Sequence, residues 1–195
     1  MVAEYIKQFF FDNNQDWDNL VIFGIRNDAN PEMDMFNDVL GFICDDELHL
    51  AKGTTDPGVY YTQNPLNKDG AFHFNLGWQE KIWRLRKHRN KYLALCDDWK
   101  TNKISGWRDK NKNHINDDGI EVFDNVGGNL HLASNDDLIL YSSAGCQVTP
   151  DKKFFNKLIN CAKDSGQDLF SYMLFSIDWI PTNIIVEIMN TLNVR

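Results

Sequence analysis

The chain has 195 residues, of which 43% are hydrophobic and 13% aromatic, and this composition excludes a disordered chain because it supplies enough apolar surface for a buried core. The net charge of −8 argues against a nucleic-acid-binding protein, whose contact face would be basic. No apolar run has membrane-spanning length, and the N-terminus lacks the positive start and apolar core of a secretory signal. We therefore expect a single domain over residues 1–195, made in the cytoplasm without a signal peptide, with no membrane span and no nucleic-acid partner.

The first half of the chain predicts one helix followed by short strands. Residues 3–11 carry aromatic and aliphatic side chains at helical spacing. Residues 20–26 are continuously apolar, which is typical of a buried strand, and a polar loop follows as far as Pro31. The runs 39–43 and 48–51 flank an acidic turn and predict a hairpin. Further short strands are predicted at residues 60–61, 71–74, 92–95 and 104–107.

The polar loop over residues 109–119 has acidic and amide side chains that alternate faintly as in a calcium-binding loop. The position where such a loop needs glycine holds His114, and the position where it needs glutamate holds Ile120. The calcium interpretation therefore fails on mechanism, and we expect neither a metal site nor a cofactor.

The second half of the chain predicts a strand over residues 129–133, in which the side chain of His131 leaves the face opposite to its apolar neighbours. The remaining elements are a helix over 150–161, a strand over 170–177 and a short helix over 184–192, the last within a C-terminal helical extension at 179–195. Many short strands with few helices predict an α+β domain that is mostly β.

The most informative feature of the chain is Cys146, which follows His131 by fifteen positions (146 − 131). A thiol among small residues, with an imidazole a short loop away, is a typical arrangement of a nucleophile and its base. Gly145 permits close approach of the backbone to a substrate, and Ser142 and Ser143 supply hydroxyls for orientation. A lone cysteine is more often a small buried residue, so it is the surrounding pattern that favours a nucleophile.

The other three cysteines, Cys44, Cys96 and Cys161, lie in apolar surroundings and are interpreted as packing residues. No Cys-x-x-Cys pair occurs, which removes support for zinc-ribbon and thioredoxin-like sites. The spacings are irregular and the chain is longer than those that need disulfide bonds, so we expect all four thiols to be reduced.

The remaining histidines are weighed by their neighbours. His88 lies in a basic stretch and either helps to form the site or is a surface residue, and the whole basic run over 81–91 is more often a solvated face than a binding surface for an anionic partner. His73 alternates with aromatic residues and is interpreted as structural. Asp109 either orients a base or caps a turn, and the turn is favoured. His49 and His114 have no neighbours in the sequence that indicate a catalytic or metal-binding group.

The pairing of Asn129-Leu130-His131 with Ser142-Ser143-Ala144-Gly145-Cys146 resembles the catalytic motif of the L,D-transpeptidase (YkuD-like) family, in which a histidine precedes a Ser-x-Gly-Cys loop. The run over 143–148 is more similar to a divergent branch found in bacteriophage proteins. Other stretches that resemble this branch are 24–26, 36–38, 54–58, 88–95 and 107–109, so the resemblance covers about residues 20–178.

This resemblance implies a β-sandwich-like domain with Cys146 as nucleophile and His131 as base, and with Ser142, Ser143, Gly145 and His88 as possible support. In that family the thiolate attacks the acyl carbon of a peptidoglycan stem peptide, and an amine or water then accepts the acyl group. Backbone amides near Gly145 and Cys146 would hold the oxyanion. Hydrolysis and transpeptidation remain open alternatives, and delivery to the cell wall or association with a virion is expected.

Two departures from the family pattern affect this interpretation. The family has arginine two residues after the cysteine, where this chain has Val148, and often histidine where this chain has Ala144. A peptide carboxylate would then have to be met by Arg108 or by the basic run. The alternative is a non-catalytic virion structural or binding protein that retains the fold, and a third interpretation is an intracellular cysteine peptidase of other specificity.

Overall fold

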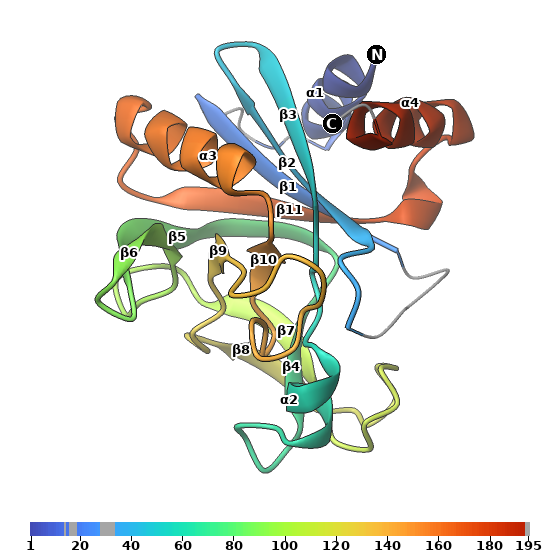
Figure 1. Ribbon diagram of the computed structural model, residues 1–195, viewed down its shortest axis with the longest axis vertical. Coiled ribbons are helices and arrows are strands. Elements are labelled where there is room, and N and C mark those ends of the chain that lie inside the picture. The colour runs from blue at the N-terminus through green and yellow to red at the C-terminus, as the bar shows by residue number, and fades with distance from the viewer. Residues whose placement is uncertain (14, 16–18, 28–33, 194–195) are drawn as a thin grey trace.

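The computed structural model describes residues 1–13, 15, 19–27 and 34–193, and it has a mixed α+β fold made mostly of strands (Figure 1). The helices in this part of the chain are α1 (Val2–Asp12), α2 (Val59–Gln63), α3 (Lys152–Asp164), the 3-10 helix η1 (Ile177–Trp179) and α4 (Thr182–Asn193). The strands are β1 (Leu20–Arg26), β2 (Asp38–Cys44), β3 (Glu47–Gly53), β4 (Ala71–Phe74), β5 (Gly77–His88), β6 (Tyr92–Cys96), β7 (Ile104–Asp109), β8 (Glu121–Asp124), β9 (Leu130–Leu132), β10 (Gln147–Thr149) and β11 (Phe170–Ser176). Most of the polar loop predicted up to Pro31 lies outside the described residues.

Eight strands form the main sheet in the order β10-β9-β6-β5-β11-β1-β2-β3. The pairs β1–β11 and β9–β10 are parallel and the other pairs are antiparallel. The two outer strands meet where Thr54 N donates to Val148 O at 2.8 Å and Val148 N donates to Thr54 O at 2.9 Å. The sheet is therefore nearly closed and barrel-like. The predicted α+β class, mostly β, is confirmed, whereas the sandwich stays a prediction.

A smaller sheet, β4-β7-β8, lies with α2 at the lower end of the molecule in Figure 1. Its β4–β7 pair is antiparallel, with Phe72 opposite Arg108 and Ala71 opposite Asp109. Because side chains alternate along a strand, Phe72 and Arg108 share one face of this ribbon, and His73 and Asp109 share the other. Each face of the ribbon therefore carries a different group of side chains.

The helices cover two separate hydrophobic cores. Helix α3 begins at Asp151, whose carboxylate accepts hydrogen bonds from the amides of Lys153 and Phe154. Its apolar side, which includes Leu158, packs with Trp83 of β5 in one core. Helices α1 and α4 lie side by side over the other face of the β1, β2, β3 and β11 part of the sheet (Figure 1). No helix among the described residues has the length and apolar character needed to cross a membrane.

One sequence prediction is wrong in local structure, and one strand was not predicted. Tyr60 and Tyr61 lie in the short helix α2 and not in a strand, because the Gly58 carbonyl accepts from Thr62 N and starts a helical turn. The basic run 81–91 contributes most of β5, the longest strand described, together with its turn into β6. In β5 the two-residue alternation is broken where Lys81 has φ +51°, so the strand pattern is hidden in the sequence.

The expectation that all four thiols are reduced is also wrong. Cys44 at the end of β2 and Cys161 in α3 form a disulfide bond, with their Cα atoms 6.3 Å apart. The two residues are 117 positions apart in sequence, so their approach depends on the packing of α3 against the sheet. Cys96 and Cys146 are free thiols.

Candidate active site

Cys146 and His131 line one open cavity of about 560 Å³ at the β9–β10 edge of the main sheet. Its walls come from the β5–β6 hairpin, from the chain before and within β9, from the segment leading into β10, and from the β4–β7 ribbon. His88, Ser142 and Gly145 also line it. Ser143 is fully buried behind it, so the structure brings the sequence-predicted site residues to one place.

The segment that carries the thiol is held in a fixed shape by the two serines. The Ser143 hydroxyl accepts from Gly145 N at 3.2 Å and donates to Cys146 O at 2.8 Å. The Ser142 hydroxyl bonds instead to Ser134, 2.9 Å between the two oxygens. Gly145 has φ +117°, and a Cβ there would lie 2.3 Å from the carbonyl oxygen of Phe72. Glycine is therefore required next to the thiol, and both serines position backbone.

His131 is buried in β9 with the geometry of a neutral base. Its Nδ1 lies 3.0 Å from the carbonyl oxygen of Leu132, so Nδ1–H donates there and Nε2 keeps its lone pair. Its ring stacks on that of His88, with 4.3 Å between centroids and 20° between planes. Burial, with further contributions from His88 and Arg89, lowers the pKa of His131 to about 4. The imidazole is therefore neutral at pH 7 and able to accept a proton.

The thiol of Cys146 is also neutral at rest. Burial raises its pKa, and the Asn129 backbone amide and the Arg89 guanidinium oppose that effect. The Cys146 thiol donates to Gly127 O at 3.7 Å and makes no hydrogen bond to His131. The parallel register pairs Val148 with His131, which sets the thiol and the imidazole on adjacent segments of backbone. Cys146 and His131 are thus an uncharged thiol–imidazole pair facing one cavity.

Backbone amides near the thiol differ in their partners. Gly145 N donates to Ser143, and Gln147 N donates to Asn129 O at 2.8 Å. The Cys146 amide makes no hydrogen bond with any described residue. Of these three backbone amides, the Cys146 amide is therefore the one that can donate a hydrogen bond to an oxyanion formed when the thiol attacks.

Two cavity residues without a role in the sequence-based interpretation hold the site together. The Asp97 carboxylate accepts from Gly127 N at 2.7 Å, and Asp97 N donates to the side chain of Asn129. The Asn129 amide group in turn lies 3.4 Å from Nδ1 of His88. This chain of contacts fixes the segment before β9 and the histidine stack. Asn129 lies in the recognised motif, but Asp97 had no signal in the sequence.

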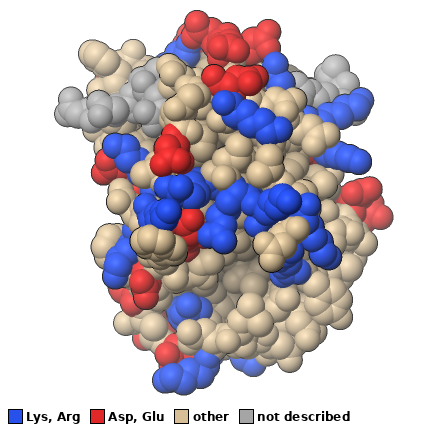
Figure 2. Space-filling view, turned by 90° about the vertical axis from the view of Figure 1, so that its left-hand side faces the viewer, with Lys and Arg blue, Asp and Glu red and all other residues tan. Residues whose placement is uncertain are grey.

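The cavity has a cationic wall. Arg86, Lys87 and Arg89 from the β5–β6 hairpin and Arg108 from β7 all line it. Lys and Arg side chains form a band across this face of the molecule, above a hollow in the surface (Figure 2). The last residues of the basic run are exposed, as the solvated-face interpretation expects, and they also line the cavity. Val148, at the position where the family has arginine, is fully buried and cannot replace them.

Three of these cations, Lys87, Arg89 and Arg108, lack a carboxylate partner among the described residues. Arg86 pairs with Asp98 at 3.2 Å, whereas Arg89 and Arg108 form no ion pair there. Arg108 donates to Gly70 O at 3.1 Å, and burial lowers its pKa. A guanidinium of this kind is suited to bind a carboxylate through two parallel hydrogen bonds. The cavity therefore combines a thiol, a base and unpaired cationic groups.

The other sequence candidates lie elsewhere or have a different role. Cys96 also lines the cavity, but burial raises its pKa to about 12. His49 stacks on Phe42, away from the cavity. Asp109 accepts backbone hydrogen bonds from the loop that follows it, which confirms the turn-capping role. His73 is fully buried, as expected of a structural residue, but it lies close to His114, for which no constellation was predicted.

No known protein family, curated protein or solved structure matches this chain in sequence or structure comparisons.

Proposed function

We propose that this protein catalyses cysteine-dependent acyl transfer or hydrolysis on peptidoglycan stem peptides, as a divergent phage-type member of the L,D-transpeptidase family with the sandwich fold of that family. The observation that carries the proposal is the shared cavity. It combines the Cys146 thiol, the neutral base His131 and the unpaired cations Arg89 and Arg108.

The proposed reaction begins with an uncharged pair. As Sγ of Cys146 attacks the acyl carbon of the peptide, its proton moves to Nε2 of His131, and the Cys146 amide holds the oxyanion. The leaving amine takes that proton and departs, leaving a thioester on Cys146. Water or an acceptor amine, deprotonated by His131, then attacks the thioester and frees the thiol. His88 supports the base by stacking on its ring.

Substrate recognition is assigned to the cationic wall. A stem peptide carries free carboxylates, and Arg89 and Arg108 are the cavity guanidinium groups without a carboxylate partner among the described residues. In this chain they take the role of the family arginine that Val148 replaces. Arg89→Gln and Arg108→Gln should therefore raise KM for peptides with a free carboxylate and leave KM for the matched amidated peptides nearly unchanged. Arg84→Gln is the control, because Arg84 pairs with Asp168 at 3.1 Å outside the cavity.

The decisive experiment uses purified muropeptides with and without an acceptor amine. Acid quenching followed by intact-mass measurement should show an acyl adduct on the wild-type protein and on Cys96→Ala, but not on Cys146→Ala. His131→Ala should lose turnover by orders of magnitude, because a nucleophile and its base act as a unit. The ratio of hydrolysed to aminated product would separate peptidase from transpeptidase activity.

One observation favours a second function, a non-catalytic virion structural or binding protein. The thiol of Cys146 has a raised pKa and donates to Gly127 O, and not to the imidazole. Wild-type protein that leaves muropeptides unchanged across about pH 5 to 9, and forms no adduct, would favour this second function over the first.

A further inference from the structure

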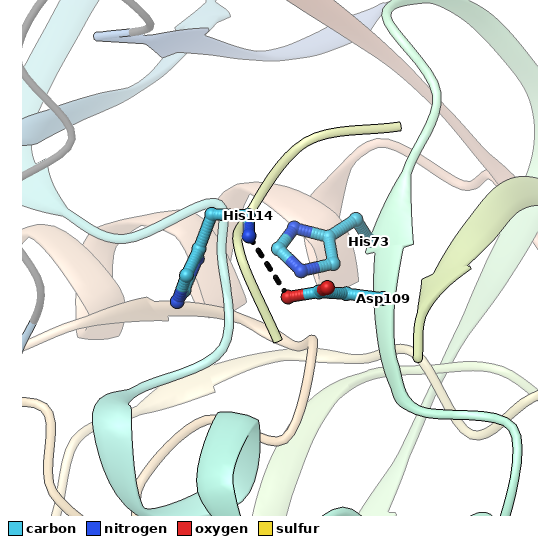
Figure 3. A group of neighbouring side chains, drawn as sticks. All are labelled: His73, Asp109 and His114. Atoms are coloured by element: carbon cyan, nitrogen blue, oxygen red, sulfur yellow. Dashed lines mark hydrogen bonds between the residues drawn. The ribbon is translucent and has the colours of Figure 1, made fainter. Parts of the chain in front are cut away.

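A second cluster of reactive side chains lies on the face of the β4–β7 ribbon opposite to the cavity. His73 of β4, Asp109 of β7 and His114 of the following loop each bring one metal-ligating atom to within 4.8 Å of the others (Figure 3). Phe72 and Arg108, their neighbours in sequence, face the cavity instead. This cluster is therefore separate from the Cys146 site and shares with it only the strands that carry both.

His73 is held rigidly and has an unused nitrogen. Its Nδ1 lies 2.8 Å from Oδ1 of Asp56, and its ring stacks on Trp107 at 4.1 Å between centroids. The side chain is almost fully buried, yet Nε2 has no hydrogen-bond partner among the described residues. Leaving a buried polar atom unpaired is costly, so such an atom needs an explanation. The Nε2 of His114 is a second buried atom in the same condition.

Asp109 brings the loop of His114 toward His73. One carboxylate oxygen accepts from Asn113 N and the other from His114 N, each at 3.0 Å (the second bond is drawn in Figure 3). Each oxygen retains a lone pair for another partner. The base of the same loop is closed by Asp118, which accepts from two more backbone amides. The loop therefore holds His114 next to the buried histidine.

We propose that His73, Asp109 and His114 bind one divalent transition-metal ion, with zinc as the matching ion, and that this ion fixes the 109–119 loop to the β4–β7 ribbon. Two imidazole nitrogens and one carboxylate oxygen form a donor set typical of three-ligand zinc sites. The carboxylate of Asp56 on Nδ1 of His73 is the outer partner that orients a metal-binding histidine and leaves Nε2 for the ion. Calcium and magnesium prefer oxygen ligands and fit this donor set poorly.

The charge of the surroundings agrees with a bound cation. Asp38, Asp56 and Asp109 bring three carboxylates into this region, and among the described residues the guanidinium that pairs with one of them is that of Arg26, 3.0 Å from Asp56. A divalent cation would offset the excess of negative charge.

The size of the cluster requires a small adjustment on binding. Zinc bonds of about 2.0–2.2 Å place ligand atoms roughly 3–4 Å apart, so the present spacing must contract by about 1 Å. The loop of His114 lies at the surface and can supply that movement. Beside it is a cavity of about 30 Å³ lined by His114 and Asp56, which has room for a water molecule.

The test is metal binding by the full chain after treatment with a chelator. We expect the wild-type protein to bind one equivalent of Co²⁺ with the visible absorption of a low-symmetry site, to release it to Zn²⁺, and to show a higher Tm with Zn²⁺. His114→Gln should weaken binding at least about tenfold. This substitution keeps the backbone amide that Asp109 accepts, so the loop is expected to retain its fold. His49→Gln is the matched control and should bind like the wild type.

The same titration in a Cys146→Ala background excludes binding by the thiol and its neighbouring histidines. Binding that survives Cys146→Ala and is lost in His114→Gln supports the site. Binding that is lost with Cys146→Ala, that is equal in His114→Gln and the wild type, or that is absent from the folded wild-type protein would overturn it. None of these results depends on peptidoglycan turnover, so this proposal and the proposed function can fail independently.

Discussion

The burial of His131 should make the free energy of unfolding depend on pH, and the substitution His131→Gln should remove that dependence. The side chain is 5% exposed, and burial lowers its pKa to about 4, against about 6.5 in an unfolded chain. Below about pH 6.5 the unfolded chain therefore holds a proton that the folded chain does not bind until about pH 4. The contribution of neutral His131 to the free energy of unfolding is therefore fully present above about pH 6.5. It is lost as the pH falls from about 6.5 to about 4.

The magnitude follows from the two pKa values. A difference of about 2.5 between them corresponds to at most about 3.4 kcal/mol, which is reached below about pH 4. At pH 5 the expected loss is about 2 kcal/mol. The pKa of His88, which stacks on His131, is also lowered by burial, so its contribution has the same sign. His131→Gln removes the first contribution and retains most of the second.

The measurement is urea unfolding followed by tryptophan fluorescence at pH 7.5 and pH 5. On going to pH 5, the wild-type protein should lose about 2 kcal/mol more of its free energy of unfolding than His131→Gln does. Equal losses in the two proteins would refute the argument, because the histidine would then titrate alike in both states. An NMR titration of the ring that gave a pKa near 6.5 in the folded protein would contradict it directly.

Three further predictions concern the thiols and the loop of the site. Under non-reducing conditions iodoacetamide should alkylate Cys146 before Cys96, whose pKa is about 12, and peptide mapping that found Cys96 modified first would contradict this order. Gly145→Ala should lower the free energy of unfolding by about 2–4 kcal/mol, because of its left-handed φ and the close carbonyl of β4, and an unchanged urea midpoint would disprove that strain. Reduction of the Cys44–Cys161 disulfide should lower the free energy of unfolding by roughly 5 kcal/mol because of its long loop, and a Tm that is insensitive to reductant would show that the bond does not form in solution.

The elements that could be predicted from the sequence are those with a local signal. The apolar run over 20–26 is strand β1, and the strand predicted over 170–177 is β11. The helix predicted over 150–161 is α3, with its apolar side buried and a capping aspartate before it. Each of these signals lies within a few consecutive residues. The pairing of β1 with β11, 150 positions apart at Phe23 and Met173 (173 − 23), has no such local signal.

The pairing of Cys146 with His131 in the candidate site could also be predicted, and the reason lies in the topology of the sheet. A loop of moderate length between His131 and Cys146 allows β9 and β10 to pair in parallel, and this pairing sets the two residues on adjacent segments of backbone. The pKa values could not be predicted, because they depend on burial beneath the β5–β6 hairpin. The His73, Asp109 and His114 cluster was missed because His73 is 36 positions before Asp109 (109 − 73), and the antiparallel β4–β7 pair brings them together.

The basic run of β5 shows why charge alone does not decide the role of a segment. Arg84 is paired with Asp168, whereas Arg89, five positions later, has no ion-pair partner among the described residues and faces the cavity of Cys146. Both residues belong to one run with one sign of charge, so composition assigns them the same role. Arg84 lies within β5, whereas Arg89 follows the strand in the turn into β6 and has φ +47°. A charge run therefore predicts a cationic surface, and the partners that the fold brings to each residue decide which of its cations can meet a substrate.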